Sequence, residues 1–161
     1  NQTEQIKKLW LPALEKKYFD VTQKFLNVKL DKTDVFSTYF TYMHLCSYSE
    51  KGKYFFISVW TSPIYQINII THELLHLLFI RYYKKHCLRK GLAKNQFENL
   101  KEAMTFIINE DIYKGIVLAN DIGYPQHRKF RQLLHKEWVK DNNFKRLLDY
   151  GINYSKSHFS Q

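Results

Sequence analysis

Two histidines and a glutamate lie within one short segment, His72-Glu73-Leu74-Leu75-His76. In a helix, residues four positions apart project from the same face, one turn apart, so both imidazoles can bind a single metal ion. Glu73 lies beside that face, where its carboxylate can hold a water molecule without being a metal ligand. Zinc carries out hydrolysis when three protein ligands leave one coordination position open. The segment therefore predicts a Zn²⁺ site with Glu73 as general base, and it requires a third ligand from elsewhere in the chain.

The residues around this motif predict that it is buried. Between Ile69 and Ile80, only Thr71 and the three motif residues are polar, which is typical of a helix enclosed on nearly all sides. Burying two imidazoles and a carboxylate without partners is unfavourable by several kcal/mol. A bound metal ion would provide a partner for these groups. The alternatives are a hydrogen-bonded His/Glu cluster without metal and a motif that survives in a protein that has lost its metal.

A carboxylate on the next predicted helix is the candidate for the third ligand. Glu102 follows His76 by 26 positions and lies in the middle of a polar stripe on an otherwise apolar segment. If the stripe faces the motif helix, Glu102 reaches the metal; the alternative is that the stripe is the solvated side of an amphipathic helix. The stripe consists of Glu98, Glu102, Thr105 and Asn109. Other candidates for the third ligand are Glu98, the main rival, and His127 and His135.

Helices around a small sheet are expected to position these residues. Apolar periodicity predicts helices over 4–27, 64–86, 95–114, 126–140 and 143–150, with Pro12 kinking or restarting the first. Residues 35–48 and 54–60 are rich in β-branched and aromatic side chains and flank a turn at 50–53, which predicts a hairpin. The expected fold class is α+β, a small antiparallel sheet with surrounding helices in a single domain over 1–161.

With Glu102 as third ligand, the motif resembles the gluzincin arrangement of zinc metallopeptidases, over roughly residues 54–114. The run 102–106 is also similar to the glutamate helix of ImmA/IrrE-type peptidases, a small intracellular branch. The resemblance implies zinc-dependent hydrolysis of a peptide or protein substrate, and a zincin-like active-site helix followed by a glutamate helix. It further implies that the strand before the motif, here 57–61, binds extended substrate by main-chain pairing.

The chain departs from both patterns at named positions. Lys101 and Phe106 stand where the thermolysin-like pattern has Asn and Asp, and Leu75 stands where the ImmA/IrrE motif usually has Gly. The sequence therefore indicates a gluzincin-like enzyme of a family that these motifs do not specify.

A second electrophile commonly stabilises the oxyanion in such hydrolysis. Tyr124 and His127 are the candidates for this catalytic role, both in the loop 121–128. Arg128 and Tyr113 are further possibilities. Alternatively, the loop is only a turn and a helix start, with Tyr124 packed against the core.

Composition and charge limit the classes of protein to which the chain can belong. The 161 residues carry a net charge of +10, with 45% hydrophobic and 17% aromatic residues, which excludes disordered and fibrous proteins. Basic clusters at 82–86 and 127–131 are compatible with nucleic acid, although solvated helix ends are favoured. The alternative function is a non-catalytic, metal-containing binding or regulatory module whose basic surface holds nucleic acid or an acidic protein.

The sequence also gives expectations about membranes and location. No segment approaches the roughly 20 apolar residues of a membrane span, and the N-terminus lacks a signal pattern. Cys46 and Cys87 are expected to be reduced thiols, and the expected location is cytoplasmic.

Overall fold

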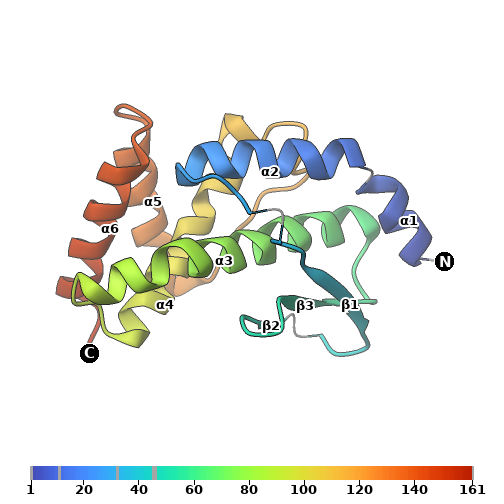
Figure 1. Ribbon diagram of the computed structural model, residues 1–161, viewed down its shortest axis with the longest axis horizontal. Coiled ribbons are helices and arrows are strands. Elements are labelled where there is room, and N and C mark those ends of the chain that lie inside the picture. Colours follow the sequence, from blue (N-terminus) through green and yellow to red (C-terminus); the bar gives the residue numbers. More distant parts are fainter. Residues whose placement is uncertain (1, 11, 32, 45–46, 161) are drawn as a thin grey trace. The chain divides into compact units, whose positions relative to one another are not determined.

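The computed structural model of the chain combines helices with one small sheet and describes residues 2–10, 12–31, 33–44 and 47–160 (Figure 1). The α+β class is therefore confirmed. By its contacts the chain divides into two compact units, residues 1–77 with 108–121 and residues 78–107 with 122–161. The single-domain interpretation stays a prediction.

Two helices open the first unit, α1 (Gln2–Leu9) and α2 (Pro12–Leu26). Pro12 begins α2, which suits a residue with no N–H to donate and a φ already set for a helix. The expected restart at Pro12 is thus confirmed. The buried face of α2 contacts later parts of the unit through Tyr18, whose hydroxyl donates to the Thr71 carbonyl at 2.8 Å, and through Thr22, which is hydrogen-bonded to the Tyr113 hydroxyl at 2.8 Å.

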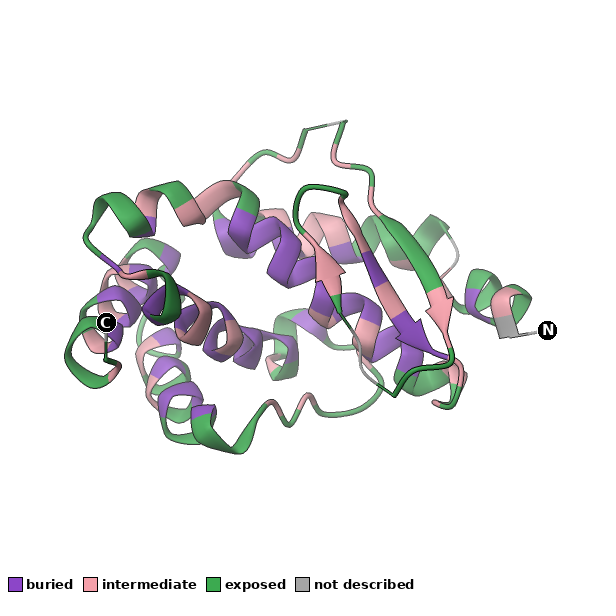
Figure 2. Cartoon of the chain, turned by 90° about the horizontal axis from the view of Figure 1, so that it is seen from below, coloured by how far each residue is buried: buried purple, intermediate pink, exposed green. Residues whose placement is uncertain are grey.

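The sheet has three strands in the order β1-β3-β2: β1 (Ser37–Thr41), β2 (Tyr48–Ser49) and β3 (Tyr54–Ser58). β2, at the end of the predicted strand, pairs with β3 in antiparallel fashion across the expected turn. β1, which covers more of the predicted strand, pairs with β3 in parallel, so the sheet is mixed and not antiparallel as predicted. Figure 2 shows the outer strand β1 largely exposed and its neighbour β3 mostly buried.

The predicted strand over 35–48 is shorter than expected, because β1 ends at Thr41. The Thr41 hydroxyl accepts the Met43 N–H at 3.1 Å, and a side chain that bonds its local backbone in this way competes with the ladder. β2 lies between β1 and β3 in the sequence and pairs with the other edge of β3. Cys46 and its neighbour at position 45 lie outside the described residues.

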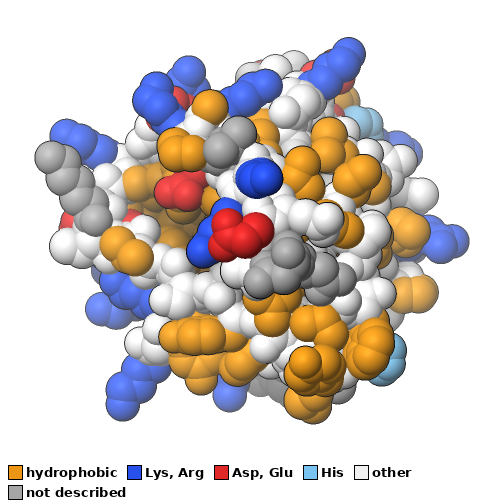
Figure 3. All heavy atoms as spheres, turned by 90° about the vertical axis from the view of Figure 1, so that its right-hand side faces the viewer, with side chains coloured by type: hydrophobic (Ala, Val, Ile, Leu, Met, Phe, Trp, Pro, Cys, Tyr) orange, Lys and Arg blue, Asp and Glu red, His pale blue; other side chains and the backbone are white. Residues whose placement is uncertain are grey.

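Large apolar side chains of the first unit are exposed around the sheet and the start of the next helix. Trp60 donates its indole N–H to the Tyr42 carbonyl at 2.7 Å, and the two ring centroids are 6.1 Å apart. Figure 3, which shows the right-hand side of the view in Figure 1, has hydrophobic side chains gathered on that face. The exposed residues include Tyr39, Tyr42, Met43, Trp60, Ile64 and Tyr65.

Helix α3 (Pro63–Arg89) carries the His-Glu-His motif and spans the predicted 64–86. It begins on a proline at the first helical position, and Gly91 follows its end with φ +89°, a conformation that favours glycine. Residues 73–80 are all buried, so the burial expected from the apolar surroundings of the motif is confirmed.

The second unit packs α4 (Lys94–Met104), α5 (Arg128–Trp138) and α6 (Phe144–His158) against one another. The predicted helix over 95–114 is shorter than expected: α4 ends at Met104, and 3₁₀ turns follow at Thr105–Asn109 and Asp111–Tyr113. A further 3₁₀ turn, Pro125–His127, precedes α5. Helix α6 continues to His158, beyond the predicted end at residue 150.

Cys87 is a buried, free thiol on α3, and its burial raises its pKa to about 12. Because the thiolate is the reactive form, we expect Cys87 to resist alkylation at pH 8 in the folded protein, where only about 10⁻⁴ of the thiol is ionised. Mass-spectrometric mapping of iodoacetamide adducts checks this. Rapid native labelling at Cys87, comparable to labelling in urea, would contradict it.

Close packing of α4 against α6 at Gly151 gives a stability prediction. A Cβ placed on Gly151 would lie 2.6 Å from Leu100 Cδ1 and 3.4 Å from Leu134 Cδ2. We expect Gly151→Val to lower the free energy of unfolding by about 2 kcal/mol through overpacking. Urea titration followed by circular dichroism measures the change, with Asn153→Val, at an exposed position of the same helix, as the control.

Candidate metal centre

His72 and His76 lie on adjacent turns of α3, as their spacing predicts. Their ring centroids are 4.4 Å apart with the rings nearly perpendicular. His76 is only 1% exposed, and the His72 side chain is 18% exposed. The two imidazoles therefore share one face of the helix, at the edge of its buried surface.

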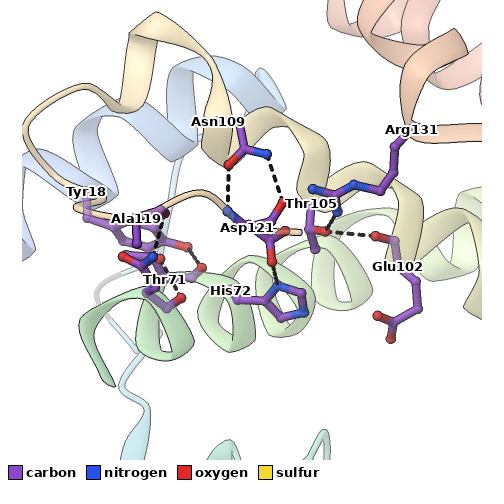
Figure 4. Close-up of polar contacts among 10 residues, drawn as sticks. Tyr18, Thr71, His72, Glu102, Thr105, Asn109, Ala119, Asp121 and Arg131 are labelled. Carbon is purple, nitrogen blue, oxygen red and sulfur yellow. Dashed lines mark hydrogen bonds and ion pairs between the residues drawn. The ribbon is translucent and has the colours of Figure 1, made fainter. Parts of the chain in front are cut away.

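Asp121 orients His72, and sequence reasoning did not identify it. The His72 Nδ1 lies 3.1 Å from Asp121 Oδ1 (Figure 4). A carboxylate only accepts hydrogen bonds, so this contact places the imidazole proton on Nδ1 and leaves the Nε2 lone pair for a metal. His72 and Asp121 are 49 positions apart in the sequence, so no local pattern could have revealed the pair.

Asp121 is itself held by a reciprocal pair of hydrogen bonds. The Asn109 side-chain amide donates to the Asp121 carbonyl at 2.9 Å, and its oxygen accepts the Asp121 N–H at 2.8 Å (Figure 4). This clamp fixes the backbone from which the carboxylate reaches His72. Asn109, predicted to be a member of the polar stripe, thus supports the site through Asp121.

Glu73, the predicted general base, is 8% exposed on α3. Adjacent residues of a helix point about 100° apart. The carboxylate therefore starts beside the imidazole face, where the sequence predicted it. Tyr48, from β2, borders the same helix, with its ring centroid 6.0 Å from that of His76.

Glu102 lies on α4, where both its backbone and its side chain make polar contacts. The Thr105 hydroxyl donates to the Glu102 carbonyl at 2.9 Å and accepts from the guanidinium of Arg131 (Figure 4). The Glu102 carboxylate oxygen Oε1 lies 3.1 Å from Lys101 Nζ. Because α4 ends at Met104, the predicted stripe is not one continuous helical face.

His72 and His76 belong to the first unit and Glu102 to the second. Their two imidazole nitrogens and one carboxylate oxygen make a group that could hold a metal ion. Two imidazoles and a carboxylate are a donor set that zinc accepts. Among the described residues, Glu98 is not part of this group; its Oε2 lies 2.8 Å from Lys101 Nζ.

His127 is buried in the second unit, 4% exposed. Its Nε2 lies 2.8 Å from the Asn99 side-chain oxygen, so Nε2 carries the proton in that contact. Burial lowers the pKa of His127; Glu102 opposes this shift, and Arg131 and Lys101 add to it. The imidazole is therefore neutral near pH 7.

His127 also lines an open pocket of about 360 Å³ in the second unit. Glu102 lines the same pocket, so the predicted metal ligand and the predicted catalytic histidine border one space. The complete lining is Lys94, Asn95, Glu98, Asn99, Glu102, Gln126 and His127.

The other sequence candidates lie in different surroundings. Tyr124 is 55% exposed, with its ring 6.1 Å from that of His127, so the expectation that it packs against the core is wrong. Tyr113 is buried and bonded to Thr22, and burial raises the pKa of its hydroxyl. Arg128 and His135 are exposed on α5.

Of residues 57–61, to which the resemblance assigns substrate pairing, only Ile57 and Ser58 lie in a strand. β3 ends at Ser58, and the following N–H groups bond within the chain. The Val59 N–H donates to the Thr41 carbonyl at 2.9 Å, and the Trp60 N–H donates to the Ser58 hydroxyl at 3.3 Å. The Thr61 N–H lies 3.5 Å from the Ser58 carbonyl. Residues 59–61 therefore form a turn and not a free strand edge.

No family model, curated protein or solved structure matches this chain. Its functional assignment therefore rests on the side chains described above. Within the described ranges, no helix combines the length and apolar character that a bilayer crossing needs.

The His72–Asp121 contact predicts that the carboxylate supports metal binding. Asp121→Asn preserves size but removes the obligate acceptor, and loss of such an outer partner typically weakens metal affinity 10–100-fold. Competition against a chelator of known affinity measures the change. Asp111→Asn, at an exposed position of the same unit, is the control; equal affinities in all three proteins would refute the orienting role.

Proposed function

We propose that this chain is a zinc-dependent peptidase of the gluzincin type, with His72, His76 and Glu102 as metal ligands. The observation that carries the proposal is the pair of imidazoles on one face of α3, with ring centroids 4.4 Å apart, His72 held by Asp121 and Glu73 on the same helix. Two imidazoles and a carboxylate, with a fourth position open, are a donor set of hydrolytic zinc sites.

The proposed chemistry divides between the metal and the chain. When bound, zinc acidifies water and polarises a carbonyl group. Glu73 accepts a proton from the attacking water and passes it to the leaving amine. Glu73 is buried, which limits the access of bulk water to its carboxylate. Asp121 keeps the proton of His72 on Nδ1 and so maintains Nε2 as a donor atom.

The substrate is proposed to be a peptide or protein, with Tyr124 as the residue that donates to the oxyanion. His127 is less suited to this role because its Nε2–H already bonds to Asn99, whereas the Tyr124 side chain is exposed. A cytoplasmic location belongs to the same proposal.

The second candidate is the non-catalytic binding module with a basic surface. In the cluster 127–131, His127 and Arg131 are buried, which leaves Arg128 and Lys129 as its exposed basic residues. This cluster is therefore less basic at the surface than its sequence suggests, which favours the peptidase. Metal binding together with salt-dependent binding to RNA or DNA, and no cleavage of peptides, would favour the module.

Glu73→Gln separates catalysis from metal binding. We expect the variant to retain zinc and to lose at least about 100-fold in the rate of peptide hydrolysis, because the amide cannot accept the proton. Zinc content by mass spectrometry and cleavage of a quenched fluorescent peptide library provide the two readouts. Wild-type protein that holds less than about 0.2 zinc per chain after supply of the metal would refute the proposal.

Glu102→Ala and Glu98→Ala compare the two rival ligands on α4. We expect Glu102→Ala to lower zinc affinity by more than the 10–100-fold expected for the loss of an outer partner, because it removes a direct ligand. Glu98→Ala should change affinity less than 10-fold. The reverse ranking in a chelator competition would assign the third ligand to Glu98.

A further inference from the structure

Lys101 is a buried lysine between two carboxylates of the same helix. Its side chain is 2% exposed, and lysines are almost never fully buried unless paired. The ammonium Nζ lies 2.8 Å from Glu98 Oε2 and 3.1 Å from Glu102 Oε1. Taking an ammonium out of water is unfavourable by several kcal/mol, and here two ion pairs offset that penalty.

The two contacts differ in what helix geometry provides. Glu98 and Lys101 are three residues apart, so their side chains are neighbours on the helix surface. Lys101 and Glu102 are adjacent and point about 100° apart, so their contact requires both side chains to turn toward each other. The buried Lys101 ammonium therefore turns the Glu102 carboxylate toward itself.

This contact occupies one of the two oxygens of the proposed metal ligand. A carboxylate can bind a metal through one oxygen or through both, and bidentate binding uses the position that a hydrolytic site keeps open. Glu102 is restrained at two points: its Oε1 contacts Lys101 Nζ, and its backbone carbonyl accepts the Thr105 hydroxyl.

We propose that Lys101 is a positioning residue that holds Glu102 Oε1 and so restricts Glu102 to one metal bond. The inference rests on the proposed function, because it takes Glu102 as a ligand. It goes beyond that function by assigning a role to the residue at which the chain departs from the thermolysin-like pattern. In that pattern the same position is Asn.

The test uses the full chain loaded with Co²⁺, whose visible absorption weakens as its coordination number rises. We expect Lys101→Met to give weaker visible bands than the wild type and to bind zinc about 10-fold more weakly, because Glu102 loses its restraint. Lys101→Arg keeps the charge and should restore both properties at least in part. Lys136→Met, at an exposed position of α5 in the same unit, is the control and should behave as the wild type.

The outcomes separate this inference from the proposed function. A Lys101→Met spectrum identical to the wild type overturns the inference, whatever the zinc affinity. A changed spectrum that Lys101→Arg restores supports it. Wild-type protein that binds neither Co²⁺ nor zinc instead refutes the proposed function, and the inference falls with it. Circular dichroism of the metal-free variants checks folding; if Lys101→Met does not fold, the spectrum of Lys101→Gln decides between the same two outcomes.

Discussion

Burial of polar groups on one apolar helix is the constraint on which this structure depends. Helix α3 is buried continuously from residue 73 to 80, and that stretch includes Glu73 and His76. An interior of this kind tolerates polar side chains only when they have partners. The surrounding polar residues provide such partners, and the proposed metal ion would be a further partner.

The supporting contacts share one physical logic, in which a charged side chain orients a group that must present a specific atom. Asp121 holds the His72 Nδ1 and is itself fixed by Asn109. Lys101 holds one oxygen of Glu102, and Thr105 holds its backbone. In both cases a second group restricts the side chain before any ligand binds, which lowers the entropy lost on binding. A centre organised in this way suits the proposed hydrolytic role better than a flexible surface site would.

Periodic segments were predictable, whereas strand pairing was not. The helices of α2, α3, α5 and the first part of α6 follow from apolar spacing, because burial of one face decides both the spacing and the fold. β-branched and aromatic residues marked the strands correctly, but they do not specify a partner or a direction. β1 ends at Thr41, whose hydroxyl accepts the Met43 N–H, and β1 pairs with β3 in parallel. The end of α4 at Met104 was missed because the apolar residues 106–108 continue the helical composition into a 3₁₀ turn.

The sequence by itself determined the chemistry that α3 can offer, because a spacing of four residues in a helix places His72 and His76 on one face whatever surrounds them. It also determined that this helix is buried. Only the tertiary structure decided which distant groups serve that face, since Asp121 reaches His72 across 49 residues and no local pattern encodes such a contact. It likewise decided that Lys101, which composition alone would place in solvent, is buried between Glu98 and Glu102. Local geometry can be read from spacing, whereas the partners of a buried charge depend on how the whole chain folds.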